Sequence, residues 1–148
     1  MTGNNLNKIS GLIQQAMQTI PKEALAEAVI FGSSAIVLNG VDLNREVDDL
    51  DIFVSDAVYS RLARLASEME EKAPGVFALK FGAPHIEILK EFPGVDHADV
   101  LRNAAPREGS HGMRVASLED LLRWKGAQNR EKDLKDIAII EAHLNQAD

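Results

Sequence analysis

The spacing of apolar and polar residues changes several times along the chain, and each change marks a predicted element. Apolar residues at helical spacing predict helices over residues 6–19, 22–28, 33–38, 56–72, 117–128 and 130–144. Short apolar or alternating runs predict strands over residues 28–31, 49–54, 76–81, 85–90 and 112–116. Gly82-Ala83-Pro84 is expected to join two of these strands as a hairpin. This order of elements predicts an α+β or α/β domain with a mixed sheet and two C-terminal helices.

Length and composition place the chain among ordinary globular proteins. Its 148 residues suit one domain over 1–148, and 45% are hydrophobic and 26% charged. No apolar run is long enough to span a membrane, and polar residues such as Gln14 and Gln18 interrupt the first helix, so no signal peptide is predicted. The absence of cysteine excludes disulfides and thiolate metal sites and fits a reducing cytoplasm.

Charge is unevenly distributed along the sequence. The formal net charge of −7 argues against a protein that coats nucleic acid by charge alone. Half of the sixteen Lys and Arg residues nevertheless lie between Arg102 and Lys135. This segment is therefore either a solvated helical surface or a binding surface for a phosphate-bearing substrate.

The strongest chemical signal is the pair Asp49 and Asp51. The two residues are two positions apart on a predicted strand, so both side chains point to one face while Leu50 and Ile52 point to the other. Carboxylates about 7 Å apart repel each other unless a cation lies near them. Oxygen ligands of this kind suit Mg²⁺, which takes substrate phosphates and water as its remaining ligands. Either this is a magnesium site or the strand has a polar face in contact with water.

Two further segments could complete such a site. Gly32-Ser33 follows a predicted strand and opens a predicted helix, an arrangement suited to a phosphate group, although a glycine at such a turn is also common for structural reasons alone. Glu87 is an acid in an otherwise apolar strand and shares a face with His85. If that strand lies beside residues 49–54, Glu87 supplies the third carboxylate of a two-magnesium site; otherwise it is an acid on an edge strand facing solvent.

The combination of these motifs resembles a known superfamily. Gly32-Ser33, fifteen intervening residues and then Asp49-Leu50-Asp51 is similar to the nucleotidyltransferase motif of the DNA polymerase β type. The later sequence, from residue 113 to residue 122 and then through Lys125 and residues 130–137, resembles the AbiEii-like branch, which includes toxins of toxin–antitoxin systems.

The resemblance implies roles for individual residues. It implies that Gly32 and Ser33 bind nucleotide phosphates and that Asp49 and Asp51 bind magnesium. It also points to Lys125 and Asp133 as active-site residues, the first neutralising triphosphate charge and the second orienting a ligand or holding Lys125. The alternative for these two is a solvent-exposed helical pair. Asp136 is interpreted instead as a capping or packing acid, and Trp124 as a core anchor.

The expected function is therefore that of a cytoplasmic, magnesium-dependent nucleotidyltransferase with no membrane association. It would use two Mg²⁺ ions, bound by Asp49, Asp51 and Glu87, to move an NMP from an NTP to an RNA or protein hydroxyl and release pyrophosphate. Lys125 and Asp133 would assist. The alternative is a non-catalytic module of the same fold, a binding or regulatory partner in a toxin–antitoxin or phage-defence system.

Overall fold

The computed structural model describes residues 2–146 and the side chains of residues 4–146. Met1 and residues 147–148, at the two ends of the expected domain, lie outside the described residues. The helices are α1 (Thr2–Thr19), α2 (Lys22–Leu25), α3 (Gly32–Leu38), α4 (Asp56–Ala63), α5 (His97–Asn103), α6 (Leu118–Gln128) and α7 (Glu131–Gln146). The strands are β1 (Val29–Phe31), β2 (Leu50–Phe53), β3 (Glu68–Ala73), β4 (Val76–Lys80), β5 (Ile86–Leu89), β6 (Ala105–Pro106) and β7 (Arg114–Val115).

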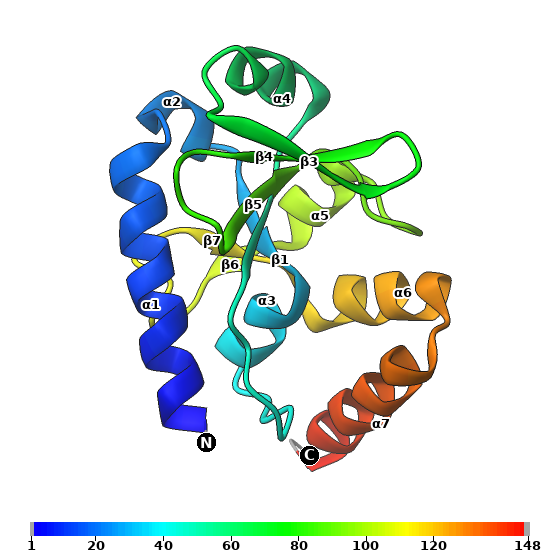
Figure 1. Cartoon of the computed structure of the whole chain (residues 1–148). Helices are drawn as coiled ribbons and strands as arrows, with labels where there is room; N and C mark the ends of the chain where they lie inside the picture. The colour runs from blue at the N-terminus through cyan, green and yellow to red at the C-terminus, as the bar shows by residue number, and fades with distance from the viewer. Residues whose placement is uncertain (1, 147–148) are drawn as a thin grey trace.

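The strands form one mixed sheet in the order β3-β4-β5-β2-β1-β7-β6. β2 pairs in parallel with β5 and antiparallel with β1, so the two strands that carry the predicted acids are neighbours. In Figure 1, α1 and the α6–α7 pair lie on opposite sides of the central strands. The predicted α+β class, with its mixed sheet and two C-terminal helices, is confirmed. No helix within residues 2–146 is both long and apolar enough to cross a membrane.

Local sequence signals explain where several elements begin and end. The Ser55 hydroxyl accepts a hydrogen bond from the Val58 amide at the start of α4, and Ser117 does the same for the Asp120 amide at the start of α6. Asn129 ends α6 in the left-handed conformation, with φ of 52°. The predicted hairpin is confirmed by the antiparallel pairing of β4 with β5.

The helix predicted over residues 56–72 is wrong in its second half. α4 ends at Ala63, and Glu68–Ala73 forms β3, an edge strand that pairs antiparallel with β4. The Glu68–Ala73 sequence has no β-branched residue and favours a helix when considered alone. Pairing with β4 and the ion pair between Glu70 and Lys80 outweigh that preference.

The core contains a cluster of aromatic rings beside β1 and β2. The ring centroids of Phe31 and Trp124 are 5.1 Å apart, those of Phe31 and Phe53 5.4 Å, and those of Phe92 and Trp124 5.8 Å. Most of these contacts are edge-on, the geometry that aromatic pairs prefer. The interpretation of Trp124 as a core anchor is confirmed, since it is 6% exposed. This cluster fixes α6 against the strand that carries Asp51.

Candidate active site

Gly32 and Asp51 meet where β1 turns into α3. Asp51 is paired with Phe31 across the antiparallel β1–β2 ladder, so the residue after Phe31 lies against the Asp51 carboxylate. A Cβ atom on Gly32 would lie 2.5 Å from Asp51 Oδ2, and the Gly32 φ of +70° disfavours any other residue. The chain therefore needs glycine here both for its backbone conformation and for the space that the carboxylate occupies. The neighbouring Ser34 hydroxyl donates a 2.6 Å hydrogen bond to the Asp49 carbonyl, which ties α3 to the start of β2.

Glu87 stands directly beside Asp51. The parallel β2–β5 ladder pairs these two residues, and Glu87 is only 8% exposed. The expectation that the strand of Glu87 lies next to that of the aspartates is confirmed. Asp49, two residues before Asp51, is exposed. It interacts with the His85 ring, whose Nδ1 lies 2.9 Å from Asp49 Oδ1.

The three acids affect the protonation of Asp51. Burial raises the pKa of Asp51, and the negative charges of Glu87 and Asp49 raise it further, while Lys72 and Lys80 partly oppose the shift; the pKa is raised from 3.8 to about 7. A group in this state gains stability when a cation comes close, because the cation offsets both the lost hydration and the repulsion. The position therefore favours a bound cation.

Two lysines that sequence reasoning missed contact Glu87. Lys72 Nζ lies 2.9 Å and Lys80 Nζ 3.3 Å from the same carboxylate oxygen, Oε2. Lys72 was missed because its segment was predicted to be helical. Lys80 lies opposite Glu87 in the β4–β5 hairpin, but a sequence pattern does not fix the register of a hairpin with so long a loop.

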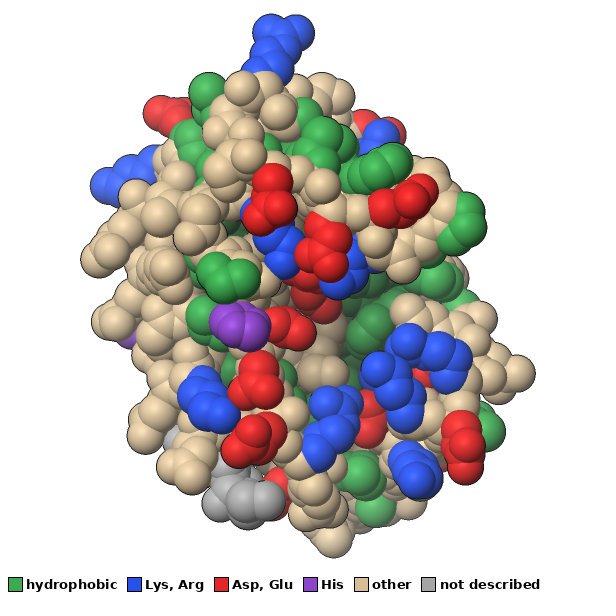
Figure 2. Space-filling view, in the orientation of Figure 1, with side chains coloured by type: hydrophobic (Ala, Val, Ile, Leu, Met, Phe, Trp, Pro, Cys, Tyr) green, Lys and Arg blue, Asp and Glu red, His purple; other side chains and the backbone are tan. Residues whose placement is uncertain are grey.

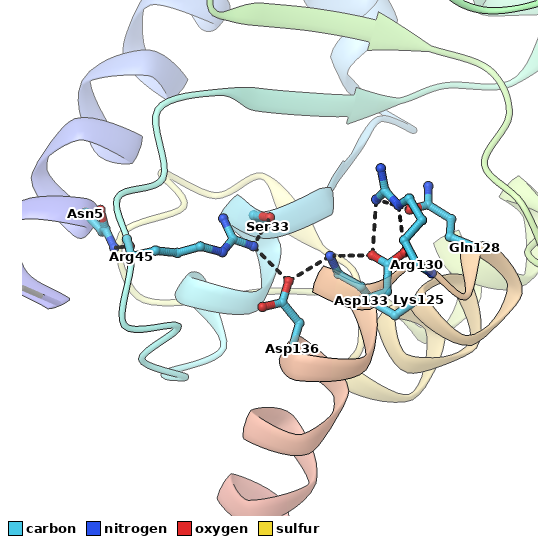
Figure 3. Close-up of polar contacts among 8 residues, drawn as sticks. All are labelled: Asn5, Ser33, Arg45, Lys125, Gln128, Arg130, Asp133 and Asp136. Atoms are coloured by element: carbon cyan, nitrogen blue, oxygen red, sulfur yellow. Dashed lines mark hydrogen bonds and ion pairs between the residues drawn. The ribbon is translucent and has the colours of Figure 1, made fainter.

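A second charged group lies where α6 meets α7. Lys125, 1% exposed, has its Nζ 3.2 Å from Asp133 Oδ1 and 2.8 Å from Asp136 Oδ2 (Figure 3). Burial raises the pKa of Asp133, but hydrogen bonds from Arg130 and Lys125 outweigh it and lower that pKa to about 2. The structure thus joins Lys125 to Asp133, and it rules out a solvent-exposed pair because Asp133 is 0% exposed.

Asp136 is part of this group rather than a simple capping or packing acid, which corrects the interpretation from sequence. Besides Lys125, it pairs with Arg45 from the loop before β2, where the Arg45 Nη2 lies 2.8 Å from its carboxylate. The same Arg45 nitrogen donates a 3.1 Å hydrogen bond to the Ser33 hydroxyl. Asn5 on α1 holds that loop through the carbonyl of Arg45 and the amide of Val47 (Figure 3 shows the first contact). Arg45 therefore links Ser33 to the Lys125 group, and no sequence motif marked it.

All the predicted site residues except Gly32 and Asp133 line one cavity of about 640 Å³. Gly32 and Asp133 lie just behind its wall, against Asp51 and Lys125 respectively. Figure 2 shows acidic side chains around the central hollow and Lys and Arg side chains on the α6–α7 side of it. An apolar part of the wall comes from Val76, Leu89 and Phe92. The volume falls in the range typical of small-molecule sites.

The donor set fits a divalent cation bound jointly with a phosphate ligand. Among the described residues, no three His, Asp or Glu side chains are arranged to hold a metal ion by themselves. Mg²⁺ commonly takes only one or two protein carboxylates and completes its octahedron with substrate phosphate and water. Asp49 and Asp51 are available for this, whereas Glu87 is already paired with two ammonium groups.

Comparison of the sequence with protein-family models and with curated proteins finds no match.

Proposed function

We propose that the chain is a nucleotidyltransferase that moves an NMP from an NTP to a hydroxyl group on RNA or protein and releases pyrophosphate. The observation that carries this proposal is the place of Asp51, which packs against Gly32 and is paired with Glu87 in the β2–β5 ladder, in a cavity also lined by Lys and Arg side chains. Acids alone would repel a triphosphate, and cations alone would not bind a metal. The cavity is lined by both kinds of group: Asp49, Asp51 and Glu87 on one hand, and Arg45, Lys72 and Arg130 on the other.

Each side of the cavity has a distinct task in this proposal. Asp49 and Asp51 would hold Mg²⁺, which polarises the phosphate oxygens and stabilises the charge that develops as pyrophosphate leaves. Arg45 and Arg130, which pair with acids of α7, would bind the phosphates through their guanidinium groups. Lys125 acts from behind them by fixing the acids that hold both arginines in place.

The bond changes follow from this placement. The acceptor oxygen forms a bond to the α-phosphorus of the NTP, and the bond from that phosphorus to the pyrophosphate oxygen breaks. The hydroxyl proton passes to a carboxylate of the acid cluster and then to water. Glu87, fixed beside Asp51, orients the acceptor on this side.

A transfer assay tests the proposal directly. The protein is incubated with Mg²⁺, each of the four α-³²P-labelled NTPs in turn, and total RNA or cell lysate. We expect label on RNA or protein with at least one nucleotide, loss of that label in Asp49→Asn/Asp51→Asn, and unchanged transfer in Asp56→Asn, an exposed acid on α4.

Two outcomes would overturn the proposal in different ways. Nucleotide binding without transfer to any acceptor would indicate a non-catalytic binding module, such as a partner in a toxin–antitoxin pair. If the protein neither binds nucleotide nor transfers label, nucleotides are not its ligands and both readings fail.

A further inference from the structure

Glu87 is held by a pair of ammonium groups from a single hairpin. β3 and β4 carry Lys72 and Lys80, and both nitrogens contact Glu87 Oε2, at 2.9 Å and 3.3 Å. Lys80 also donates a 2.6 Å hydrogen bond to the Pro84 carbonyl and lies 3.0 Å from Glu70. The hairpin therefore brings two positive charges to one oxygen of the acid that stands next to Asp51.

Burial distinguishes this contact from an ordinary surface ion pair. Glu87 is 8% exposed and Lys80 is 6% exposed, so their contact lies in a poorly hydrated place, where an unpaired charge would be costly. Lys72 is more accessible, with 39% of its side chain exposed. Lysine is ordinarily protonated at neutral pH, and each of the two ammonium groups has carboxylate partners here, so both lysines are charged.

Building on the proposed function, we infer that this site takes one divalent cation, at Asp49 and Asp51, and that Lys72 and Lys80 supply at Glu87 the positive charge of a second. Two ammonium groups carry the same formal charge as one Mg²⁺. Their position on Glu87, beside Asp51 in the β2–β5 ladder, is where a second ion shared by all three acids would lie. A divalent ion arriving there would meet Lys80, which its three oxygen partners keep in place.

The inference assigns Lys72 and Lys80 a positioning role for the acceptor side. They fix the Glu87 carboxylate and offset its charge, so that Asp51 is left to share the bound ion with Asp49. Because lysines rather than a metal ion hold Glu87, this carboxylate can orient the acceptor without a second ion binding and leaving in each turnover.

Counting bound metal tests this inference without relying on activity. Mn²⁺ is titrated into an equimolar mixture of the protein and α,β-methylene-ATP, both well above their Kd, and free Mn²⁺ is followed by electron paramagnetic resonance. We expect one Mn²⁺ per wild-type chain, shared by Asp49, Asp51 and the nucleotide phosphates. Lys72→Met should bind a second Mn²⁺ at least tenfold more tightly than wild type does, and Lys72→Met/Lys80→Met more tightly still. Lys90→Met, a matched change on a lysine stacked on Tyr59, should leave the count at one.

The outcomes separate the inference from the function on which it rests. Two Mn²⁺ ions in the wild type, or no gain of affinity in Lys72→Met, would overturn the inference while leaving the transferase proposal in place. Binding of no Mn²⁺ by the wild type would overturn both. Because Lys72 is partly exposed, the single variant decides the question even if the double variant does not fold.

Discussion

Replacing Asp51 with asparagine should make the protein more stable above neutral pH, although it removes a predicted catalytic residue. The Asp51 side chain is mostly buried, and its neighbours Glu87 and Asp49 are also acids. Asparagine has nearly the same size and shape as aspartate but carries no charge. The substitution therefore removes the cost of ionising this position and leaves the packing unchanged.

The size and sign of the effect follow from the pKa of Asp51, which is 3.8 in an ordinary setting and about 7 in the folded protein. Between these two values the folded protein retains a proton that the unfolded chain has released, so stability falls as the pH rises through this window. The full difference corresponds to about 4 kcal/mol above pH 7, an upper estimate because Lys72 and water can adjust. Asp51→Asn should equal the wild type near pH 4 and exceed it in stability by up to that amount at pH 8.

The assay is urea unfolding of both proteins at pH 4 to 8 in the presence of EDTA, followed by circular dichroism. Only the difference between the two proteins is interpreted, because the contributions of the groups that both proteins share cancel in it. Asp56→Asn, at an exposed position, serves as the matched control and should show no pH-dependent gain. Equal slopes for wild type and Asp51→Asn, or a variant less stable than wild type at pH 8, would refute the reasoning.

Three further substitutions probe the scaffold of the site, each measured by urea unfolding. Lys125→Met should lower the free energy of unfolding by about 3 kcal/mol, because Asp133 loses a buried ionic partner; a loss below about 1 kcal/mol would show that the arginines compensate. Gly32→Ala should cost about 2 kcal/mol or more, since its φ is +70° and the new Cβ would collide with Asp51; a neutral result would contradict that contact. Ser117→Ala should cost about 1 kcal/mol through loss of the α6 cap, and an unchanged stability would mean that water replaces it.

The sequence was sufficient to predict the elements whose signal is local. Gly32 marked a turn between a strand and a helix, and the alternation around Asp51 marked a buried strand, because side chains in a strand point alternately to its two faces. Ser117 marked the start of α6 for a similarly local reason, since a hydroxyl there satisfies a free amide. The proximity of Glu87 to Asp51 stayed a condition at the level of sequence, because two strand patterns do not show that the strands are neighbours, and the β2–β5 pairing supplies it.

The features that the sequence did not indicate depend on tertiary pairing. The segment of Lys72 has good helix formers and becomes a strand only because β4 lies beside it. Arg45 lies in a loop with no periodicity, and its contact with Asp136 joins residues 91 positions apart. Asp136 was interpreted from its place three residues after Asp133 on the same helical face, whereas its partners Arg45 and Lys125 lie in other elements. Pairings of this kind are set by the whole fold rather than by any segment of the chain.

The central claim is that Asp49 and Asp51 bind a divalent cation together with nucleotide phosphates. Its most direct test is thermal unfolding with Mg²⁺ and α,β-methylene NTPs. A ligand at about 100 times its Kd adds roughly 2.7 kcal/mol of stability, which raises Tm by about 5 to 10 °C in a protein of this size. We predict such a rise in the wild type for at least one nucleotide, dependent on Mg²⁺ and absent in Asp49→Asn/Asp51→Asn. An equal rise in that variant, or no rise in the wild type with any of the four nucleotides, would contradict the claim.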